Sequence, residues 1–333
     1  MLKKIISSPD LSLYSLKFKE FNLIDSYIAS TRETRAISNN PFVMGIKYTD
    51  YLEKACSKIL TGLFENKLIS IKEKESIVFN ILRGGLNFGL RNALSSAFGW
   101  NYHGCSFISA QRARKDDSPE EWHIIESEYT KVYMPETASI IIGDVVATGT
   151  SLEHAIKALV NETKKQGANL KSIIFFTFGG KRAAEILNST DKMCREKFKD
   201  YQRTVLIYHE GCFSVPDEKT PLSVKETGTD LVRLNSIMAP EFIESQYTNP
   251  LYPLQRCVIY DAGSRAFWIP EYLEDLKNYW TQLKNLAENG LNFHTLLNER
   301  FPELDQTRFS QTDLTKICNS HLEEIEKLIS DNN

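Results

Sequence analysis

The sequence has few cysteines, and no two of them lie close together in the chain. Six cysteines are spread over 333 residues without a Cys-x-x-Cys pair. This spacing argues against a disulfide framework and against a zinc site of the common type, and it indicates reduced, mostly buried thiols. The six histidines likewise lack the spacing of metal ligands or of a catalytic triad. Both residue types are therefore expected to be structural or to lie on the surface.

Long hydrophobic runs and an excess of basic residues are also missing. No apolar run approaches the length that spans a membrane, and the segment Met1–Ile6 is too short for the apolar region of a signal peptide. We therefore expect a cytoplasmic protein without a membrane partner. The formal net charge of −3 argues against a general nucleic-acid binder, although a local basic loop around an anionic substrate is compatible with it.

The residues that are present are typical of a soluble globular protein with one large domain and an addition. Hydrophobic residues make up 42% of the chain and charged residues 25%. From about residue 76 onward, short runs of buried-strand type alternate with helical patterns, which predicts βαβ units. The strands are expected at 77–82, 104–109, 140–146, 173–178, 205–209 and 258–260. The predicted fold class is α/β, with a mostly parallel sheet flanked by helices.

Three regions are predicted along the chain. Residues 1–70 are expected to form a helical cap, with Thr49–Leu63 as its clearest helix, and residues 71–268 the α/β domain. Residues 269–333 are expected to be a helical extension that packs on the domain, a dimer contact being the alternative. Within the domain, the charged residues 111–128 are expected to form a mobile loop. Residues 213–256 hold five of the eleven prolines and are expected to be a long irregular insertion.

Residues 139–151, SIIIGDVVATGTS, combine a buried strand, an acid and a small-residue loop. Asp144 lies near the carboxyl end of the strand, and the loop is followed at once by an amphipathic helix. Small side chains allow backbone N–H groups to approach an anion, and the helix N-terminus favours negative charge. The segment predicts a phosphate-ester site, the alternative being an ordinary strand-turn-helix. Its loop residues are Ala147, Thr148, Gly149, Thr150 and Ser151.

A second anion-binding pattern follows the strand at residues 77–82. Arg83, Gly84 and Gly85 combine a guanidinium with two residues that lack side chains. Arginine binds phosphate oxygens in a fork, and the glycines allow a close backbone approach. Alone, Arg-Gly-Gly is commonly a turn. Its position at a strand end, about sixty residues before the phosphate loop, favours a pyrophosphate loop.

These motifs resemble those of the type I phosphoribosyltransferases, which transfer phosphoribose from phosphoribosyl diphosphate (PRPP). Residues 139–151 resemble the PRPP motif, except that Gly143 stands where the family has its first acid. The stretch 80–86 resembles the pyrophosphate loop of the uracil branch. His209-Glu210-Gly211 is similar to an Asp-Glu-Gly that follows a strand in that branch, and Asp261–Phe267 is similar to its Gly-Asp-Ala-Gly-Asp-Arg-x-Phe-Gly motif. The base-binding Pro-Gly-Leu-Gly of that branch is replaced by Cys257–Tyr260.

The resemblance implies a set of roles. Arg83, Asp144 and Asp261 are expected to be catalytic, with Asp144 on the ribose hydroxyls and Asp261 near the pyrophosphate and Mg²⁺. Tyr260, Gly84 and Gly85 are expected to bind substrate together with the phosphate loop 147–151. The alternative for Asp261 is an Asx-type turn. The expected partners are PRPP and a nucleobase-like molecule, and a homo-oligomer, a dimer, is also expected.

Arg112, Arg114 and Lys115 are the basic residues of the charged loop. A basic loop that closes over the site would exclude water and neutralise the leaving group. The alternative is a solvated charge run, since neighbouring acids cancel the positive charge. The sequence thus predicts an enzyme that transfers the 5-phosphoribosyl group to a uracil-like base. The alternatives are a non-catalytic PRPP or nucleotide sensor and a nucleotide hydrolase on a related sheet.

Overall fold

The computed structural model describes residues 2–109, 111–115, 118–126, 129–224, 229–309 and 312–331, with backbone alone in 111–126. Among these residues, ten strands form one mixed sheet, in the order β1-β2-β3-β11-β10-β9-β4-β5-β8, with β12 paired to β11. The strands are β1 (Lys3–Ser7), β2 (Ser12–Leu16), β3 (Asp25–Ser30), β4 (Ser76–Leu82), β5 (Gly104–Ser109), β8 (Thr130–Lys131), β9 (Thr137–Gly143), β10 (Asn169–Gly180), β11 (Arg203–Ser214) and β12 (Val232–Met238).

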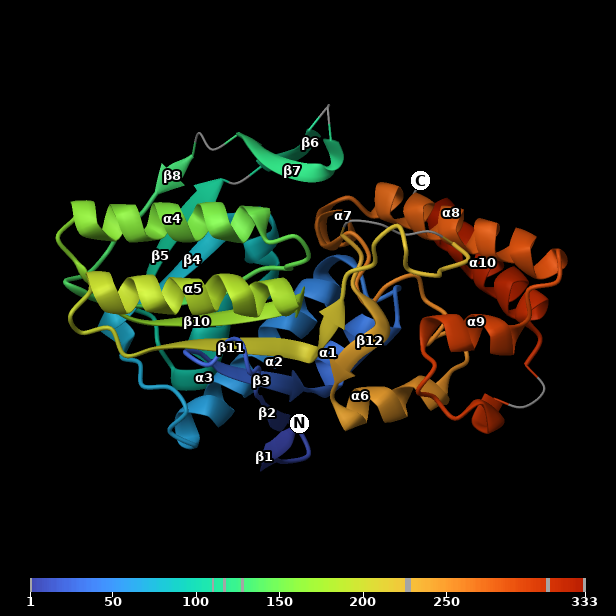
Figure 1. The fold of residues 1–333 in the computed structure, drawn as a ribbon, viewed down its shortest axis with the longest axis horizontal. Coiled ribbons are helices and arrows are strands. Elements are labelled where there is room, and N and C mark those ends of the chain that lie inside the picture. The colour runs from blue at the N-terminus through green and yellow to red at the C-terminus, as the bar shows by residue number, and fades with distance from the viewer. Residues whose placement is uncertain are drawn as a thin grey trace.

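The six central strands, β3-β11-β10-β9-β4-β5, run parallel, and the outer pairs are antiparallel. Helices cover both faces, with α4 and α5 on one face and α1, α2 and α3 on the other (Figure 1). These are α1 (Arg32–Asn39), α2 (Gly45–Glu65), α3 (Leu90–Phe98), α4 (Thr150–Lys165) and α5 (Lys181–Lys197). Because both faces are covered, a central strand such as β9 is buried almost throughout. The predicted α/β class is confirmed.

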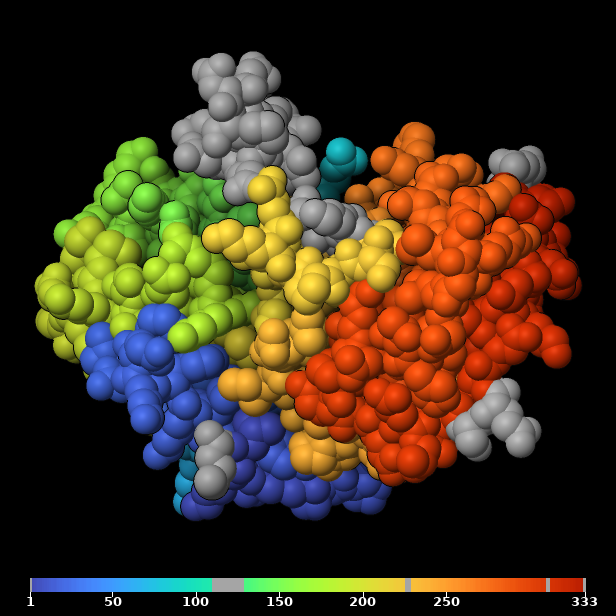
Figure 2. Space-filling view, turned by 45° about the vertical axis from the view of Figure 1, so that its right-hand side comes forward, coloured from blue at the N-terminus to red at the C-terminus, as the bar shows by residue number. Residues whose placement is uncertain are grey.

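The C-terminal part of the chain is a helical block beside the sheet. Figure 2 shows this block in orange to red, next to the green and blue parts that hold the sheet. Strand β11 points toward it in Figure 1. The block therefore stands at the carboxyl ends of the parallel strands, where open α/β sheets bind ligands. Its elements are α7 (Ala262–Phe267), α8 (Ile269–Glu288), α9 (Phe293–Arg300), the 3₁₀ turn η4 (Gln306–Phe309) and α10 (Leu314–Asp331).

The prediction of a helical cap over residues 1–70 is wrong for its first half. Strands β1 to β3 occupy residues 3–30, and only α1 and α2 are helical, α2 containing the predicted helix at Thr49–Leu63. Strand β3 pairs in parallel with β11 and has five buried residues. Short apolar runs do not distinguish a strand from a buried helix, and here pairing with a distant strand decides the structure.

Three further expectations need correction. The segment 213–256 contains the end of β11, then β12, α6 (Pro240–Ser245) and η3 (Gln246–Thr248), so it is partly regular. Residues 258–260 form no strand, although all three are buried. Residues 111–128, predicted as a loop, contain the hairpin of β6 (Gln111–Lys115) and β7 (Ser118–Glu126).

The cysteines are unpaired in the structure. All six cysteines are free, and all but the half-buried Cys105 are buried. Among the described residues, none of the helices has both the length and the apolar character needed to cross a bilayer.

Candidate active site

The phosphate loop lies between β9 and α4, as predicted. Gly149 precedes α4 with a left-handed backbone (φ 79°) and gives the helix no side-chain cap. A Cβ at this position would lie 2.3 Å from the Ile186 side chain. Both the positive φ and this close contact therefore require glycine at residue 149. The hydroxyls of Thr148 and Thr150 are hydrogen-bonded at 3.3 Å. Helix α4, with 16 residues, thus opens on a loop rich in hydroxyls, a typical setting for an anion.

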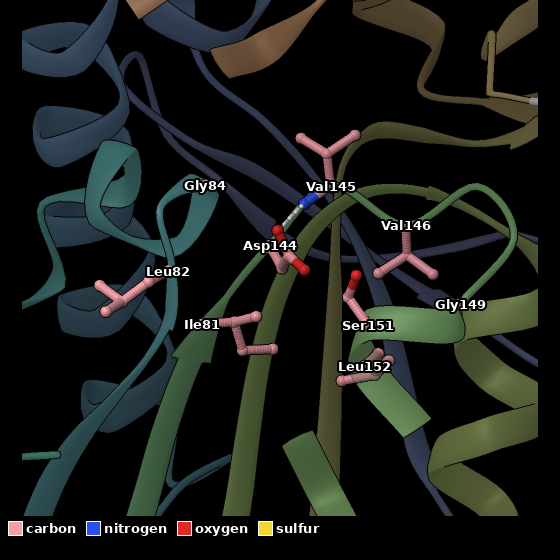
Figure 3. A pocket seen from close by; sticks show the side chains of 9 residues that line it. All are labelled: Ile81, Leu82, Gly84, Asp144, Val145, Val146, Gly149, Ser151 and Leu152. Carbon is pink, nitrogen blue, oxygen red and sulfur yellow. Dashed lines mark hydrogen bonds between the residues drawn. The ribbon is translucent and has the colours of Figure 1, made fainter. Parts of the chain in front are cut away.

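Asp144 lies at the carboxyl end of β9, beside this loop. Its backbone N–H donates to the Phe176 carbonyl at 3.1 Å, and its Oδ1 accepts from the N–H of Val145 at 2.9 Å. These bonds tie the residue to β10 and orient the carboxylate. Figure 3 shows Asp144 between the Gly84 turn and Ser151. All three line one cavity of about 120 Å³, together with Ile81, Leu82, Val145, Val146, Gly149 and Leu152.

The two glycines after β4 allow the second loop to approach Asp144. A Cβ at Gly84 would lie 3.0 Å from Oδ1 of Asp144, and one at Gly85 would lie 3.1 Å from the Gly143 carbonyl oxygen. Arg83 precedes the 3₁₀ turn η2 (Gly84–Phe88) and is exposed. It lines neither this cavity nor the larger one described in the next paragraph. The Leu82–Arg83 peptide bond is cis.

A second cavity, of about 590 Å³, extends from the strand ends to the C-terminal block. It shares Gly84, Asp144 and Val145 with the smaller cavity. Three of its other residues, Ala147, Tyr260 and Asp261, are ones that the sequence predicts at the site. The remaining lining residues have no predicted role: Thr229, Asp230, Arg256, Ile259, Ala262, Gly263, Ser264, Glu271, Tyr272 and Asp275.

One signal for the missed residues was present in the sequence. Glu271 and Asp275 are one helical turn apart in α8, so they lie on the same face of that helix. The apolar periodicity of the same helix indicates only its buried face. Asp230 and Arg256 lie in the predicted insertion 213–256, where no motif indicates them.

Asp261 is the N-cap of α7. Its Oδ1 accepts from the N–H groups of Gly263 (2.9 Å) and Ser264 (3.1 Å), and its Oδ2 from the Ser264 hydroxyl (3.3 Å). The Asx-type turn, offered as the alternative, is thus present, and the carboxylate also lines the larger cavity. The Tyr260 hydroxyl donates to Oε1 of Gln255 at 3.1 Å, so this residue reaches the cavity with its hydroxyl already bonded.

Gly143, the position of the missing acid, is packed against an aromatic ring. A Cβ built on Gly143 would lie 2.4 Å from Cγ of Phe88, and Phe88 is fully buried. Phe88 in turn stacks on His209, with ring centroids 5.9 Å apart. Burial lowers the pKa of His209 to about 3, which keeps the imidazole neutral. The space beside Asp144 is therefore filled by an aromatic cluster that leaves no room for another carboxylate.

Glu210, next to His209, is fully buried with a left-handed backbone (φ 63°). Its Oε1 accepts from the N–H of Thr31 at 3.2 Å and from the Thr34 hydroxyl. Burial raises the pKa of Glu210 to about 7. The His-Glu-Gly motif thus lies within β11, where Glu210 joins the strand to the start of α1.

The predicted lid residues lie on the backbone of β6. Arg112 pairs with Ile124 and Arg114 with Trp122 across the hairpin, and Lys115 pairs with Ser118. Their side chains lie outside the described part of the structure, so the structure does not test the proposed contact with a leaving group.

Comparisons with family models and with curated proteins find no match. Among solved structures, a hypoxanthine phosphoribosyltransferase from Staphylococcus aureus is 16% identical, over 58% of this chain and 89% of its own, with a TM-score of 0.29. A hypoxanthine-guanine phosphoribosyltransferase from Bacillus anthracis is 16% identical over 39% and 69%, with a TM-score of 0.26. The hypoxanthine enzyme of Trypanosoma cruzi is 12% identical over 63% and 92%, with a TM-score of 0.24. Likenesses at these scores carry no argument about the function of this chain.

Proposed function

We propose that this chain is a phosphoribosyltransferase that moves the 5-phosphoribosyl group of PRPP to a nucleobase or base-like acceptor and releases pyrophosphate. The observation that carries the proposal is the pair of cavities that share Gly84, Asp144 and Val145. One cavity offers the N-terminus of α4 with Ser151, and the other extends from the same carboxylate toward a separate wall. A phosphorylated sugar and an acceptor thus have adjoining places at the ends of the parallel strands.

Each part of PRPP has a proposed partner. Backbone and hydroxyl groups of residues 147–151 bind the 5-phosphate at the start of α4. Asp144 accepts hydrogen bonds from the ribose hydroxyls, since a carboxylate only accepts. Gly84 and Gly85 present backbone N–H groups to the diphosphate, and the exposed Arg83 supplies a guanidinium at the same loop.

In the proposed reaction, a nitrogen lone pair of the acceptor forms the bond to C1 of the ribose. The C1–O bond to the diphosphate breaks, its electron pair leaves with the diphosphate oxygen, and the nitrogen's proton passes to solvent. Positive charge builds on the sugar and negative charge on the leaving group, so positioned dipoles and charges lower the barrier. Neither a nucleophilic side chain nor a dedicated general base is required.

Mg²⁺ fits this site as an ion that arrives with its substrate. Among the described residues, no group of three His, Cys, Asp or Glu side chains could hold a metal ion. Mg²⁺ commonly binds through one or two carboxylates together with substrate phosphates and water. Asp261, which lines the larger cavity, is the carboxylate we assign to it, and when bound the ion would neutralise charge on the diphosphate.

The identity of the acceptor base and the oligomeric state are the more specific parts of this proposal. The resemblance of Asp261–Phe267 to the uracil branch is the support for a uracil-like base, whereas the base-reading residues of that branch are replaced here. A homo-oligomer rests on the same resemblance. The class of acceptor is considered again below from the residues of the cavity.

A sensor of PRPP or of a nucleotide is the second candidate, and the packing of Phe88 favours it. The ring occupies the space that a second carboxylate would need beside Asp144. A site with one acid retains fewer bonds to the ribose, which favours binding without efficient turnover.

Incubation of the full chain with radiolabelled PRPP, Mg²⁺ and a panel of bases separates these functions. Formation of nucleotide and pyrophosphate supports the transferase. Saturable PRPP binding without product supports the sensor instead. Release of free base from a nucleoside monophosphate, without pyrophosphate, identifies a hydrolase.

Two substitutions test the site itself. Asp144→Asn and Arg83→Ala should each abolish turnover or weaken PRPP binding by at least about tenfold, since a hydrogen bond to a charged group contributes about 1.5–3 kcal/mol. Arg91→Ala, at an exposed arginine on α3, is the matched control and should bind PRPP like the wild type. Wild-type activity in either folded site variant would refute the assignment, with circular dichroism as the check on folding.

A further inference from the structure

The wall of the larger cavity on the side of the C-terminal block is acidic. Among the described lining residues, five are carboxylates and one is a cation, Arg256. Asp144 lies at the strand ends. The other four carboxylates belong to this wall, namely Asp230, Asp261, Glu271 and Asp275. An acceptor that approaches C1 of the ribose from this side therefore meets these carboxylates.

The charge of Arg256 is already neutralised within the wall. Its Nε and Nη2 donate to the two carboxylate oxygens of Asp230 at 3.2 Å each, and its Nη1 lies 2.7 and 2.9 Å from the oxygens of Asp275. Asp230 is 7% exposed, so its pair with Arg256 is well shielded. One guanidinium between two carboxylates leaves a net negative charge, and an anionic acceptor gains no ion pair with Arg256 unless it breaks these bonds.

The other two carboxylates of the wall also present acceptor atoms. Glu271 is exposed in the first turn of α8, with the Ser264 hydroxyl 3.4 Å from its Oε2. Asp261 caps α7 with both oxygens, as described above. An ionised carboxylate accepts hydrogen bonds and donates none, so this wall suits a ligand that brings N–H donors.

We infer that the acceptor is an amino-bearing heterocyclic base, neutral or cationic, and not a carboxylated base or a base with carbonyls alone. This inference rests on the proposed function. The amino group donates to the carboxylates of the wall while a ring nitrogen attacks C1 of the ribose. A carboxylated base is repelled by the same wall. The edge of uracil has a single N–H donor between two carbonyl oxygens, and those oxygens would face acceptors that cannot pair with them.

The test measures pyrophosphate release by the full chain with PRPP, Mg²⁺ and six bases. Adenine and cytosine carry amino groups, uracil and hypoxanthine carry carbonyls, and orotate and nicotinate are carboxylated. We expect kcat/KM for the better amino-bearing base to exceed that for each other base by at least about tenfold. An equal or higher value for uracil, hypoxanthine, orotate or nicotinate would overturn the inference while leaving the transferase intact. Absence of release with every base would overturn the proposed function and the inference together.

A matched pair of variants on α8 links the selectivity to the wall. Glu271→Gln replaces a lining carboxylate by an amide, which also donates, and it should lower the preference for the amino-bearing base about tenfold. Glu274→Gln changes an exposed glutamate of the same helix that does not line the cavity, and it should leave the preference unchanged. An unchanged preference in Glu271→Gln, or an equal loss in both variants, would contradict the assignment.

Discussion

Gly143 and Phe88 are coupled by contact, and this coupling predicts how the missing acid can be restored. Gly143→Asp alone brings a Cβ to 2.4 Å from Phe88 Cγ, and we expect overpacking to cost about 1–3 kcal/mol of the free energy of unfolding. Phe88→Ala alone should cost about 3–5 kcal/mol, because a cavity forms. In the double variant the new side chain enters that cavity, so the total should be smaller than the sum by about 1 kcal/mol or more.

Urea unfolding of the four proteins measures this coupling. Phe88→Ala combined with Gly290→Asp is the control, since a Cβ at Gly290 meets nothing within 4 Å, and its two effects should add. Strict additivity for the Gly143 and Phe88 pair would show that the ring does not hold the glycine in place. Something other than the Phe88 ring would then oppose a carboxylate at residue 143.

Glu210 makes the stability of the fold depend on pH. Its pKa is about 7 in the fold against an ordinary value of 4.5, so the folded protein binds the proton more tightly than the unfolded chain. The stabilisation is complete below pH 4.5 and is lost as the pH rises through 7. Relative to Glu210→Gln, the wild type should lose about 3 kcal/mol of the free energy of unfolding over this range.

Chemical denaturation between pH 4.5 and 8 tests this expectation. Glu65→Gln, at an exposed carboxylate at the end of α2, is the control and should keep the wild-type slope. His209, whose pKa is lowered to about 3, acts in the opposite direction, since its contribution is lost as the pH falls below its ordinary 6.5. Parallel curves for wild type and Glu210→Gln would mean that Glu210 stays ionised in the fold.

At the scale of elements, the sequence predicts those whose signal is local. The strand, acid, loop and helix of residues 139–165 are found as expected, because buried β-branched runs and helical periodicity need no distant partner to be recognised. Helix α2 and the helices after Pro270 follow the same rule. The two glycine-containing loops of the site were found because their backbone needs are visible in the residue types.

Elements that depend on distant pairing were missed. Strand β3 is set by β11, nearly two hundred residues later. The run at 258–260 has the composition of a strand, but within the described part of the chain it makes a single backbone bond of this kind, from the N–H of Val258 to the carbonyl of Leu231. The acidic wall was missed for a related reason. Asp230, Arg256 and Asp275 come together only when two separate segments and α8 fold against one another, so no local pattern records them.

The hairpin β6–β7 can be removed without stretching the chain, which makes its role testable. The N–H of Ser109 donates to the carbonyl of Tyr129 at 2.8 Å, so the two ends are already adjacent. A short Gly-Ser turn in place of residues 110–128 should leave the protein folded and PRPP binding present. If the hairpin excludes water as a lid, the ratio of nucleotide formed to PRPP hydrolysed should fall about tenfold or more.

Product analysis by chromatography measures this ratio, with circular dichroism as the folding check. A triple variant Arg112→Gln, Arg114→Gln, Lys115→Gln is the companion, since it keeps the hairpin and removes its basic charge. A ratio unchanged by the deletion would exclude the hairpin as a lid. A ratio lowered by the deletion alone would assign the effect to water exclusion, apart from charge.

At the scale of the whole molecule, one buried arginine joins the C-terminal block to the sheet domain. Arg265 of α7 is fully buried, and it donates from Nε to the Val43 carbonyl at 2.7 Å and from Nη2 to those of Ile37 and Asn40 at 3.0 and 2.8 Å. Its guanidinium also lies near the Tyr48 and Tyr272 rings. The motif that suggested a role near pyrophosphate thus places this side chain in the structural contact between α7 and the turn before α2.

The hydrophobic core is continuous across the same contact, from Leu13 in β2 to Ile325 in α10. Arg265→Met keeps the length of the side chain and removes one hydrogen bond from each of three carbonyls, of which that of Asn40 still accepts from the N–H of Val43 at 3.1 Å. We expect a loss of about 3 kcal/mol or more, and a melting temperature lowered by about 5 °C or more. Because the core is shared, the variant should still unfold in one calorimetric transition. Arg91→Ala, at an exposed arginine, should change stability by less than about 0.5 kcal/mol. Two separate transitions in Arg265→Met would show that the block and the sheet domain fold as independent units, and the cavity between them would then depend on this single side chain for its shape.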